Sequence, residues 1–179
     1  MDEFKQNLKI PKKRVAVLIG TDGETKEEIE KQTNTSLDVD SEGAVTISSE
    51  NSLDAWLTKQ IVKAIGRGFS PKRAFRLLEE NAVLELIDLK EWSRNENDMK
   101  RIKGRVIGRE GKSKKTIQEL TGTDISVFGK TISIIGDATS VQTARKAVEM
   151  LLSGAKHATV FKLLEKEKKK KQKNKLLGW

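Results

Sequence analysis

A short run of glycines and charged residues carries the clearest chemical signal in this 179-residue chain. Residues 108–111 read Gly-Arg-Glu-Gly, and Lys112, Ser113, Lys114 and Lys115 follow them. Because glycine has no Cβ, the backbone of such a loop can approach a ligand closely. A helix that starts directly after the loop points its first amide groups and the positive end of its dipole at that ligand. The pattern therefore favours binding of a phosphate-bearing molecule.

Two glycines three residues apart also occur in ordinary tight turns, so the motif alone is a weak signal. An internal repeat strengthens it, because residues 19–39 are repeated at 107–127 with a constant offset of 88. The glycine loop of the second copy therefore has a counterpart at Gly20 and Gly23. Further matches are Ile29 with Ile117, Thr33 with Thr121, Thr35 with Thr123, Leu37 with Ile125, Val39 with Val127, 45–47 with 132–134, and 74–80 with 160–166. Two copies of one module of about 80 residues follow from this pattern.

Hydrophobic periodicity and turn residues predict the same element order in both copies: strand, helix, helix, strand, strand, helix. An extra helix after the first copy is predicted to open at Ser70 with Pro71 in its first position. Its counterpart starts near Ala158 and runs into the lysine-rich end. The predicted first-copy elements are 3–10, 12–19, 24–33, 36–40, 44–48 and 53–65; those of the second copy are 84–92, 98–108, 112–122, two strands within 125–135, and 139–152.

This order, with the glycine loop between the first two helices of each copy, resembles the KH family of RNA-binding modules. The resemblance implies an α+β fold of two tandem type I KH modules, each with a three-stranded antiparallel sheet packed with helices and an extra C-terminal helix. We expect the modules to span 1–81 and 82–165, with a basic tail at 166–179. In such a module the glycine loop grips the sugar-phosphate chain while about four unpaired bases lie in a groove beside it.

The resemblance also suggests roles for single residues of the second copy. Gly108 and Gly111 would allow close approach, and Arg109 and Lys112 would meet phosphates. Ile107, Ile117 and Ile125 would floor the base groove, although Ile117 and Ile125 could equally be core residues. Polar groups near the second strand, such as Ser126, would give specificity. The predicted RNA contacts are Arg105, Ile107, Gly108, Arg109, Glu110, Gly111, Lys112, Ser113, Lys114, Lys115, Ile125 and Ser126.

The two glycine loops differ in charge. Residues 97–119 contain eight basic and three acidic side chains, a net charge of +5, whereas residues 9–31 contain six basic and five acidic ones, a net charge of +1. A polyanion would be repelled at the first loop. We therefore expect the second module to supply most of the RNA affinity and the first to be structural or to bind protein. The loop predicted to be degenerate consists of Gly20, Thr21, Asp22 and Gly23.

Two longer segments are more distinctive than either loop. They are AIGRGFSPKRAFRLL at 64–78 and LKEWSRNENDMKRIKGRVIGREGKSKKTIQELTGTDISV at 89–127. Together they resemble the archaeal members of a ribosome-assembly family, partner of Nob one. The resemblance implies binding of single-stranded RNA near the 3′ end of the small-subunit ribosomal RNA precursor. It also implies cooperation with a Nob-type endonuclease and contact with rRNA methylation or translation initiation proteins.

Composition bounds the other possibilities. The net charge of +9 favours an anionic partner, but eight lysines and two glutamates between Lys162 and Lys175 supply +6 of it. This segment is either a solvated helix end or a nonspecific RNA contact. The chain has no cysteine and one histidine, so we expect no metal, no cofactor and no enzyme activity. We also expect no membrane association and a cytoplasmic location. The alternatives that remain open are an mRNA-binding regulator and a protein-interaction scaffold without RNA affinity.

Overall fold

The computed structural model describes residues 3–178, and the chain divides into two compact units, Met1–Leu84 and Glu85–Trp179. The division falls inside strand β4 (Ala82–Asp88), close to the boundary predicted at 81/82, which stays a prediction. None of the helices between residues 3 and 178 is both long and apolar enough to span a membrane.

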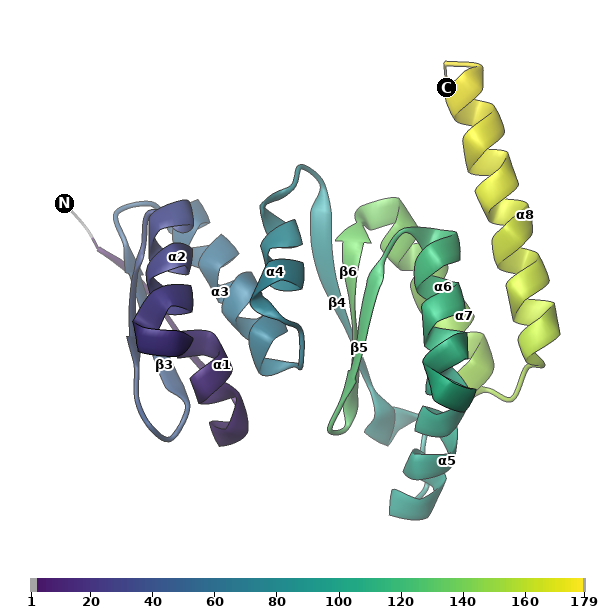
Figure 1. The fold of residues 1–179 in the computed structure, drawn as a ribbon, viewed down its shortest axis with the longest axis horizontal. Coiled ribbons are helices and arrows are strands. Elements are labelled where there is room, and N and C mark those ends of the chain that lie inside the picture. The colour runs from purple at the N-terminus through teal and green to yellow at the C-terminus, as the bar shows by residue number, and fades with distance from the viewer. Residues whose placement is uncertain (1–2, 179) are drawn as a thin grey trace. The chain divides into compact units, whose positions relative to one another are not determined.

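The first unit places helices against one face of a three-stranded sheet (Figure 1). Its sheet has the order β1-β3-β2, and both pairs are antiparallel, with Leu8 opposite Val45 and Leu37 opposite Ile47. Leu18, Ile29 and Ile47 are fully buried between the sheet and the helices. The elements are β1 (Phe4–Lys9), α1 (Val15–Ile19), α2 (Glu24–Thr33), β2 (Ser36–Val39), β3 (Ala44–Ser49), α3 (Ser52–Gly66) and α4 (Pro71–Ala74).

The second unit repeats this arrangement, and a long helix is added outside it (Figure 1). Its sheet has the order β4-β6-β5, and Ile125 on β5 lies opposite Ile134 on β6. Helix α8 packs on α6 and α7, where Val160 and Leu164 are buried. After β4 come α5 (Glu96–Ile107), α6 (Lys112–Thr121), β5 (Asp124–Phe128), β6 (Thr131–Asp137), α7 (Ala138–Leu152) and α8 (His157–Leu176).

Side-chain hydrogen bonds repeat between the units as the sequence does. The Gln118 side chain accepts a hydrogen bond from the backbone N–H of Ile125 at 2.8 Å, which ties α6 to β5. At the equivalent place, Glu30 accepts from the N–H of Leu37 at 2.9 Å. These bonds satisfy backbone donors at the start of each second strand. Paired hydroxyls 2.8 Å apart recur as well, in Thr33–Thr35 and Thr121–Thr123.

The predicted fold class, two tandem KH-type modules of the α+β class, is confirmed. Three details differ from the sequence prediction. The strand predicted at 84–92 stops at Asp88, whose carboxylate accepts a hydrogen bond from the N–H of Lys90 at 2.9 Å and turns the chain. Helix α5 starts before residue 98, because Asn95 caps it by accepting from the N–H of Asp98.

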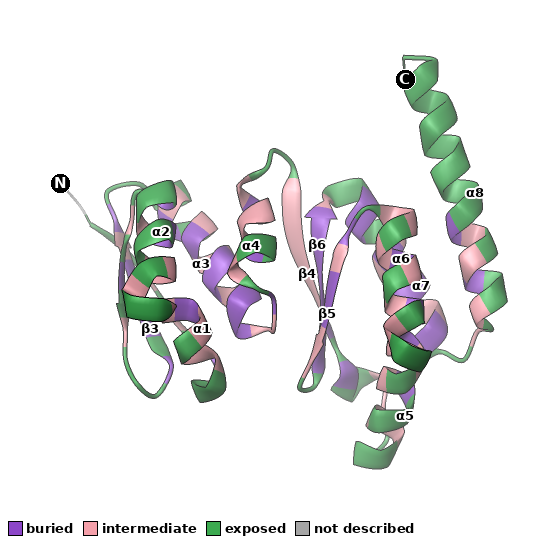
Figure 2. Ribbon diagram, in the orientation of Figure 1, coloured by how far each residue is buried: buried purple, intermediate pink, exposed green. Residues whose placement is uncertain are grey.

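The third difference concerns the extra helix of the first unit. Ser70 caps α4 as predicted, with Pro71 in the first position, but only one turn of α-helix forms before a 3₁₀ turn at Phe75–Leu78. Helix α8 continues without a break into the lysine-rich segment as predicted, since lysine, glutamate and glutamine are good helix formers. Residues 166–176 of the predicted tail are therefore the exposed half of α8 (Figure 2).

Candidate nucleic-acid interface

The loop between α5 and α6 has a backbone that only glycine adopts readily at its first position. Gly108 has φ 75° and ψ 173°, a region that is nearly exclusive to glycine. A Cβ added there would lie 2.6 Å from the Cβ and 2.7 Å from the N of Ser113. The loop therefore closes tightly onto the start of α6.

Gly111, the second glycine, faces open space. Its φ of 74° is left-handed, and a Cβ added to it would meet no atom within 4 Å. Glycine is thus needed here for its backbone angle and not to avoid a neighbouring side chain. The bare main chain at Gly111 leaves room for a second backbone to come close, which is what gripping a sugar-phosphate chain requires.

Helix α6 starts in a way that leaves its first turn suited to an anion. No side chain caps it at Gly111, whereas Asn51, Asn95 and Asp137 cap α3, α5 and α7. The first turn of α6 contains no acidic residue. The lysines that start α6 oppose the helix dipole, at a cost of about 0.3–1 kcal/mol for each residue near the end. A bound phosphate would reverse that unfavourable interaction.

Glu110 lies in the middle of the loop with φ 55°, a left-handed conformation that is strained for a residue with a side chain. Its exposed carboxylate is 3.9 Å from Nζ of Lys112, a loose surface ion pair. Asp22 in the first unit has φ 53° at the equivalent place. Both modules therefore keep the same strained loop, a feature often found where a backbone is held ready for a ligand.

The structure brings most of the predicted contacts together around this loop. The side chains of Arg109, Glu110, Lys112 and Lys115 are exposed, while Ile107, Gly108, Gly111 and Lys114 are half-buried beside them. Three others are buried: Ser113 under Gly108, and Ile125 and Ser126 on β5. Ile117 and Ile125 are at most 1 % exposed, so in this conformation they are core residues and their side chains do not reach the surface.

Arg105, predicted to contact RNA, donates hydrogen bonds to the backbone of the second unit. Its Nε donates to the carbonyl of Leu151 at 2.9 Å, and its Nη2 donates to the carbonyl of Ala155. The guanidinium is thus used to hold α5 against the end of α7, and we no longer assign it to RNA. The ring Nε2 of His157 lies 2.7 Å from the carbonyl oxygen of Arg105, and this contact links the start of α8 to α5.

The first unit contains an arginine with the same pair of hydrogen bonds, an equivalence that the alignment of the two internal repeats missed. Arg14 donates from Nε to the carbonyl of Ile65 at 2.8 Å and from Nη2 to that of Phe69 at 2.9 Å. Burial lowers the pKa of Arg14 from its usual value. Arg14 and Arg105 are 91 residues apart and not 88, so the fixed offset hid their equivalence.

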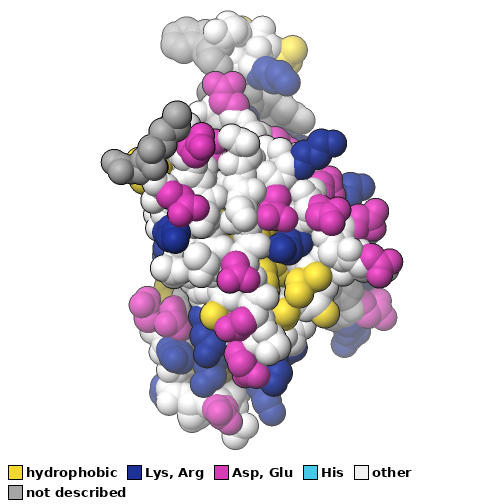
Figure 3. Space-filling model, turned by 90° about the vertical axis from the view of Figure 1, so that its left-hand side faces the viewer, with side chains coloured by type: hydrophobic (Ala, Val, Ile, Leu, Met, Phe, Trp, Pro, Cys, Tyr) yellow, Lys and Arg dark blue, Asp and Glu magenta, His cyan; other side chains and the backbone are white. Residues whose placement is uncertain are grey.

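The first loop differs from the second in charge and not in shape. Gly20 has φ 77° and ψ 177°, Gly23 is left-handed with nothing near its added Cβ, and a Cβ on Gly20 would collide with Thr25. However, Glu24 and Glu27 occupy the first turn of α2. Carboxylates there already complement the helix dipole and would repel a phosphate. On the face of the molecule that Figure 3 shows, acidic side chains lie among the basic ones.

The described residues contain no cluster for metal chemistry. Between residues 3 and 178 no group of three His, Cys, Asp or Glu side chains is placed to hold a metal ion.

Comparisons with known proteins agree with this geometry. A model of the second KH domain of PNO1, described as a eukaryotic-type (type I) KH domain, matches residues 83–169, and a KH-domain model matches residues 5–55. A KH domain-containing protein of Methanocaldococcus jannaschii is 47% identical over 173 residues, which cover 94% of this chain and 76% of that protein. The pre-rRNA-processing protein PNO1 of Debaryomyces hansenii is 32% identical over 102 residues, which cover 56% of this chain but only 40% of that protein.

Solved structures are similar over nearly the whole chain. The Dim2p chain in the a/eIF2alpha–aDim2p–rRNA complex of Pyrococcus horikoshii OT3 has a TM-score of 0.89 and 46% identity, covering 94% of this chain and 96% of that one. Dim2p from the same organism, solved separately, has a TM-score of 0.86 and 45% identity, covering 91% of this chain and 99% of that one. A protein of unknown function from Aeropyrum pernix has a TM-score of 0.92 and 36% identity, covering 99% of this chain and 97% of that one.

Proposed function

Because this chain belongs to the archaeal family of KH-domain proteins homologous to PNO1 and Dim2, we propose that it binds single-stranded ribosomal RNA during small-subunit assembly. The expected target lies near the 3′ end of the small-subunit RNA precursor. The observation that carries the proposal is the loop Gly108–Gly111, a bare backbone at an uncapped, lysine-rich helix start. The rRNA in the related Dim2p complex supports the ligand class.

In this mechanism a phosphate of the RNA meets the amide groups at the start of α6. The absence of a side chain at Gly111 lets the sugar-phosphate chain come within hydrogen-bonding distance. Arg109 and Lys112, both exposed, neutralise the phosphates on either side. Neighbouring bases lie along the groove that starts at Ile107, where their edges are read by polar groups and by the backbone. The protein binds and positions RNA with no catalytic step of its own.

We assign the greater share of the affinity to the second module. The two loops share a backbone conformation, so shape does not distinguish them. Charge does, since the first turn of α2 contains Glu24 and Glu27 and that of α6 contains no acid. The first module is then free to serve as a structural or protein-binding partner.

A protein partner is also part of the proposal. The solved complex joins a Dim2p chain, 46% identical to this one, to a/eIF2alpha. We propose that this chain binds the α subunit of initiation factor 2 in the same way. Interactions with a Nob-type endonuclease or an rRNA methylation protein, and a cytoplasmic location, rest on the sequence resemblance.

The function can be tested with a single-stranded oligonucleotide from the 3′ end of small-subunit rRNA, followed by fluorescence anisotropy. A scrambled strand of equal composition and the duplex form are the controls, and we expect clearly weaker binding to both. Crosslinking to total cellular RNA extends the test. If mRNA were recovered without ribosomal RNA, the regulator alternative would replace the assembly role; if no RNA were recovered, the scaffold alternative would replace it.

A further inference from the structure

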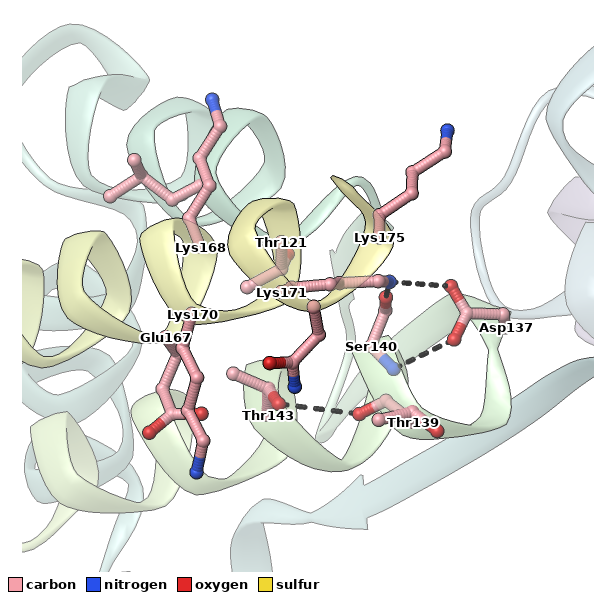
Figure 4. Close-up of a pocket in the computed structure, with 12 residues that line it drawn as sticks. Thr121, Asp137, Thr139, Ser140, Thr143, Glu167, Lys168, Lys170, Lys171 and Lys175 are labelled. Carbon is pink, nitrogen blue, oxygen red and sulfur yellow. Dashed lines mark hydrogen bonds and ion pairs between the residues drawn. The ribbon is translucent and has the colours of Figure 1, made fainter. Parts of the chain in front are cut away.

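A hollow of about 460 Å³ lies in the second unit, away from the glycine loop. Its walls come from the end of α6, the start of α7 and the exposed half of α8 (Figure 4). Lys112 begins α6 and Thr121 ends it, so the hollow and the glycine loop lie at opposite ends of this helix. The lining residues are Leu120, Thr121, Asp137, Thr139, Ser140, Thr143, Glu167, Lys168, Lys170, Lys171, Asn174 and Lys175.

Helix α8 is held over this hollow by two kinds of contact. Val160 and Leu164 bury its first half against α6 and α7. Beyond Leu164 the packing is polar: Nζ of Lys171 donates to Oγ of Ser140 at 2.8 Å and lies 3.5 Å from Oδ2 of Asp137. The position of the lysine-rich half is therefore defined, although its side chains are exposed (Figure 2).

Asp137 is ionised and balances Lys171. Burial alone raises the pKa of Asp137, but hydrogen bonds from Ser140 and the charge of Lys171 outweigh burial and hold the pKa below its usual value. The carboxylate also caps α7 by accepting from the N–H of Ser140 at 3.0 Å. One positive charge of the hollow is thus already compensated.

The charges of the other lysines of the hollow are not neutralised by a carboxylate of the described residues. Lys168, Lys170 and Lys175 form no ion pair with another residue of the 3–178 range. Lys168 and Lys175 point to one side of α8 and Lys170 to the other, so their ammonium groups do not converge on one point (Figure 4). Positive charges spread out in this way suit an extended polyanion, whose phosphates follow one another along the chain, better than a single small anion.

We propose that this α6–α7–α8 hollow is a second, sequence-independent binding site for the RNA backbone. Lys168, Lys170 and Lys175 would neutralise phosphates, and the exposed hydroxyl of Thr139 would donate to a phosphate oxygen. The inference rests on the proposed function, because it extends the contact of the same RNA from the glycine loop to the far end of α6. An RNA longer than the four nucleotides of a KH groove is needed to reach both places.

An acidic protein segment is the competing ligand, and the observations favour RNA. All the cations of the hollow are lysines, which act as point charges, whereas planar carboxylates are recognised most specifically by the bidentate fork of arginine. Hydroxyl donors beside lysines are frequent in phosphate contacts.

A pair of matched triple variants tests the site in the full-length protein. The first replaces the hollow lysines (K168Q, K170Q, K175Q), and the second replaces three exposed lysines of the same helix outside the hollow (K166Q, K169Q, K173Q). Both lose three charges. Affinity for a single-stranded RNA of about twelve nucleotides and for one of about four is measured as a function of salt.

We expect the hollow variant to lose roughly tenfold in affinity for the longer RNA at low salt, with a log–log salt slope shallower by about 2, since each phosphate contact on a single strand contributes about 0.7. The control variant should change both quantities far less, and the short RNA should bind all three proteins equally. That last result also separates the two proposals, because binding of the short RNA tests the glycine loop alone.

Three results would overturn the second site. Equal losses in the two triple variants would mean diffuse attraction by the whole helix and no defined hollow. Unchanged binding in both would mean that RNA does not reach α8. The third result is a polyglutamate peptide that binds the wild type but not the hollow variant, while the two proteins bind RNA equally. It would assign the hollow to an acidic protein.

Discussion

Gly108 lies so close to Ser113 that a Cβ on the glycine would be 2.6 Å from the Cβ of the serine. This contact closes the loop onto the first turn of α6 and gives Gly108 a φ of 75° with ψ 173°. The geometry of the proposed RNA clamp therefore depends on the absence of a side chain at Gly108. Ser113 is buried as a consequence, and its hydroxyl has no hydrogen-bond partner within the described chain.

Replacing Gly108 with alanine should destabilise the second unit by about 3 kcal/mol, because the backbone angles are strained for alanine and the methyl group collides with Ser113. Gly104→Ala is the matched control: it lies inside α5, and an added Cβ there meets no atom within 4 Å. The control should be neutral or stabilising by about 0.5–1 kcal/mol. Urea unfolding followed by circular dichroism measures both, and equal stability of the two variants would refute the close contact.

Arg105→Ala should cost about 2–3 kcal/mol of unfolding free energy, since two hydrogen bonds from a charged donor to the carbonyls of Leu151 and Ala155 are lost. Arg101→Ala, one turn earlier on α5, removes only an exposed ion pair with Asp98 and should cost about 0.5 kcal/mol or less. Thermal unfolding compares the two. RNA affinity should be unchanged in folded Arg105→Ala protein; a large loss of affinity at full stability would restore the original assignment of Arg105 to RNA.

The carboxylate of Asp137 predicts a specific response to acid. Its pKa is lower in the folded protein than the ordinary value of 3.8, so ionised Asp137 stabilises the fold at neutral pH. This contribution is complete above the ordinary pKa and is lost as the pH falls through the lowered, folded-state pKa. Asp137→Asn keeps a helix-capping side chain but cannot titrate. Its melting temperature should therefore fall less than that of the wild type between about pH 5 and about pH 2; identical acid profiles would contradict the prediction.

The fold could be predicted from the sequence because its signals are local and occur twice. The 88-residue offset identified matching residues such as Ile29 and Ile117, both of which are fully buried. Glycines at φ > 0 marked the loops, and Ser70 with Pro71 marked α4. The end of β4 was missed, because it is set by one hydrogen bond that the Asp88 carboxylate accepts from the N–H of Lys90 and not by hydrophobic alternation.

The candidate site was predicted less completely. Glycine spacing located the loop, but residue type alone could not tell a cation that faces solvent, such as Arg109, from one that holds two helices together, such as Arg105. The difference depends on which carbonyls end α7, and those are 46 and 50 residues further along the chain. The hollow beside α8 was equally hidden, since it requires α8 to pack on α6 and α7.

The central claim, that the second loop supplies most of the RNA affinity, is tested most directly by one matched pair of substitutions. Gly111→Asp and Gly23→Asp each place a carboxylate at the start of a ten-residue helix, at positions with φ 74° and 82° and no atom within 4 Å of the added Cβ. Each substitution therefore changes the net charge by the same amount and meets the same left-handed backbone, and thermal unfolding of both variants corrects for any difference in stability. We predict that Gly111→Asp lowers affinity for single-stranded small-subunit 3′ RNA by at least about tenfold, while Gly23→Asp changes it by less than about twofold. Equal losses in the two variants, or a larger loss from Gly23→Asp, would contradict the account.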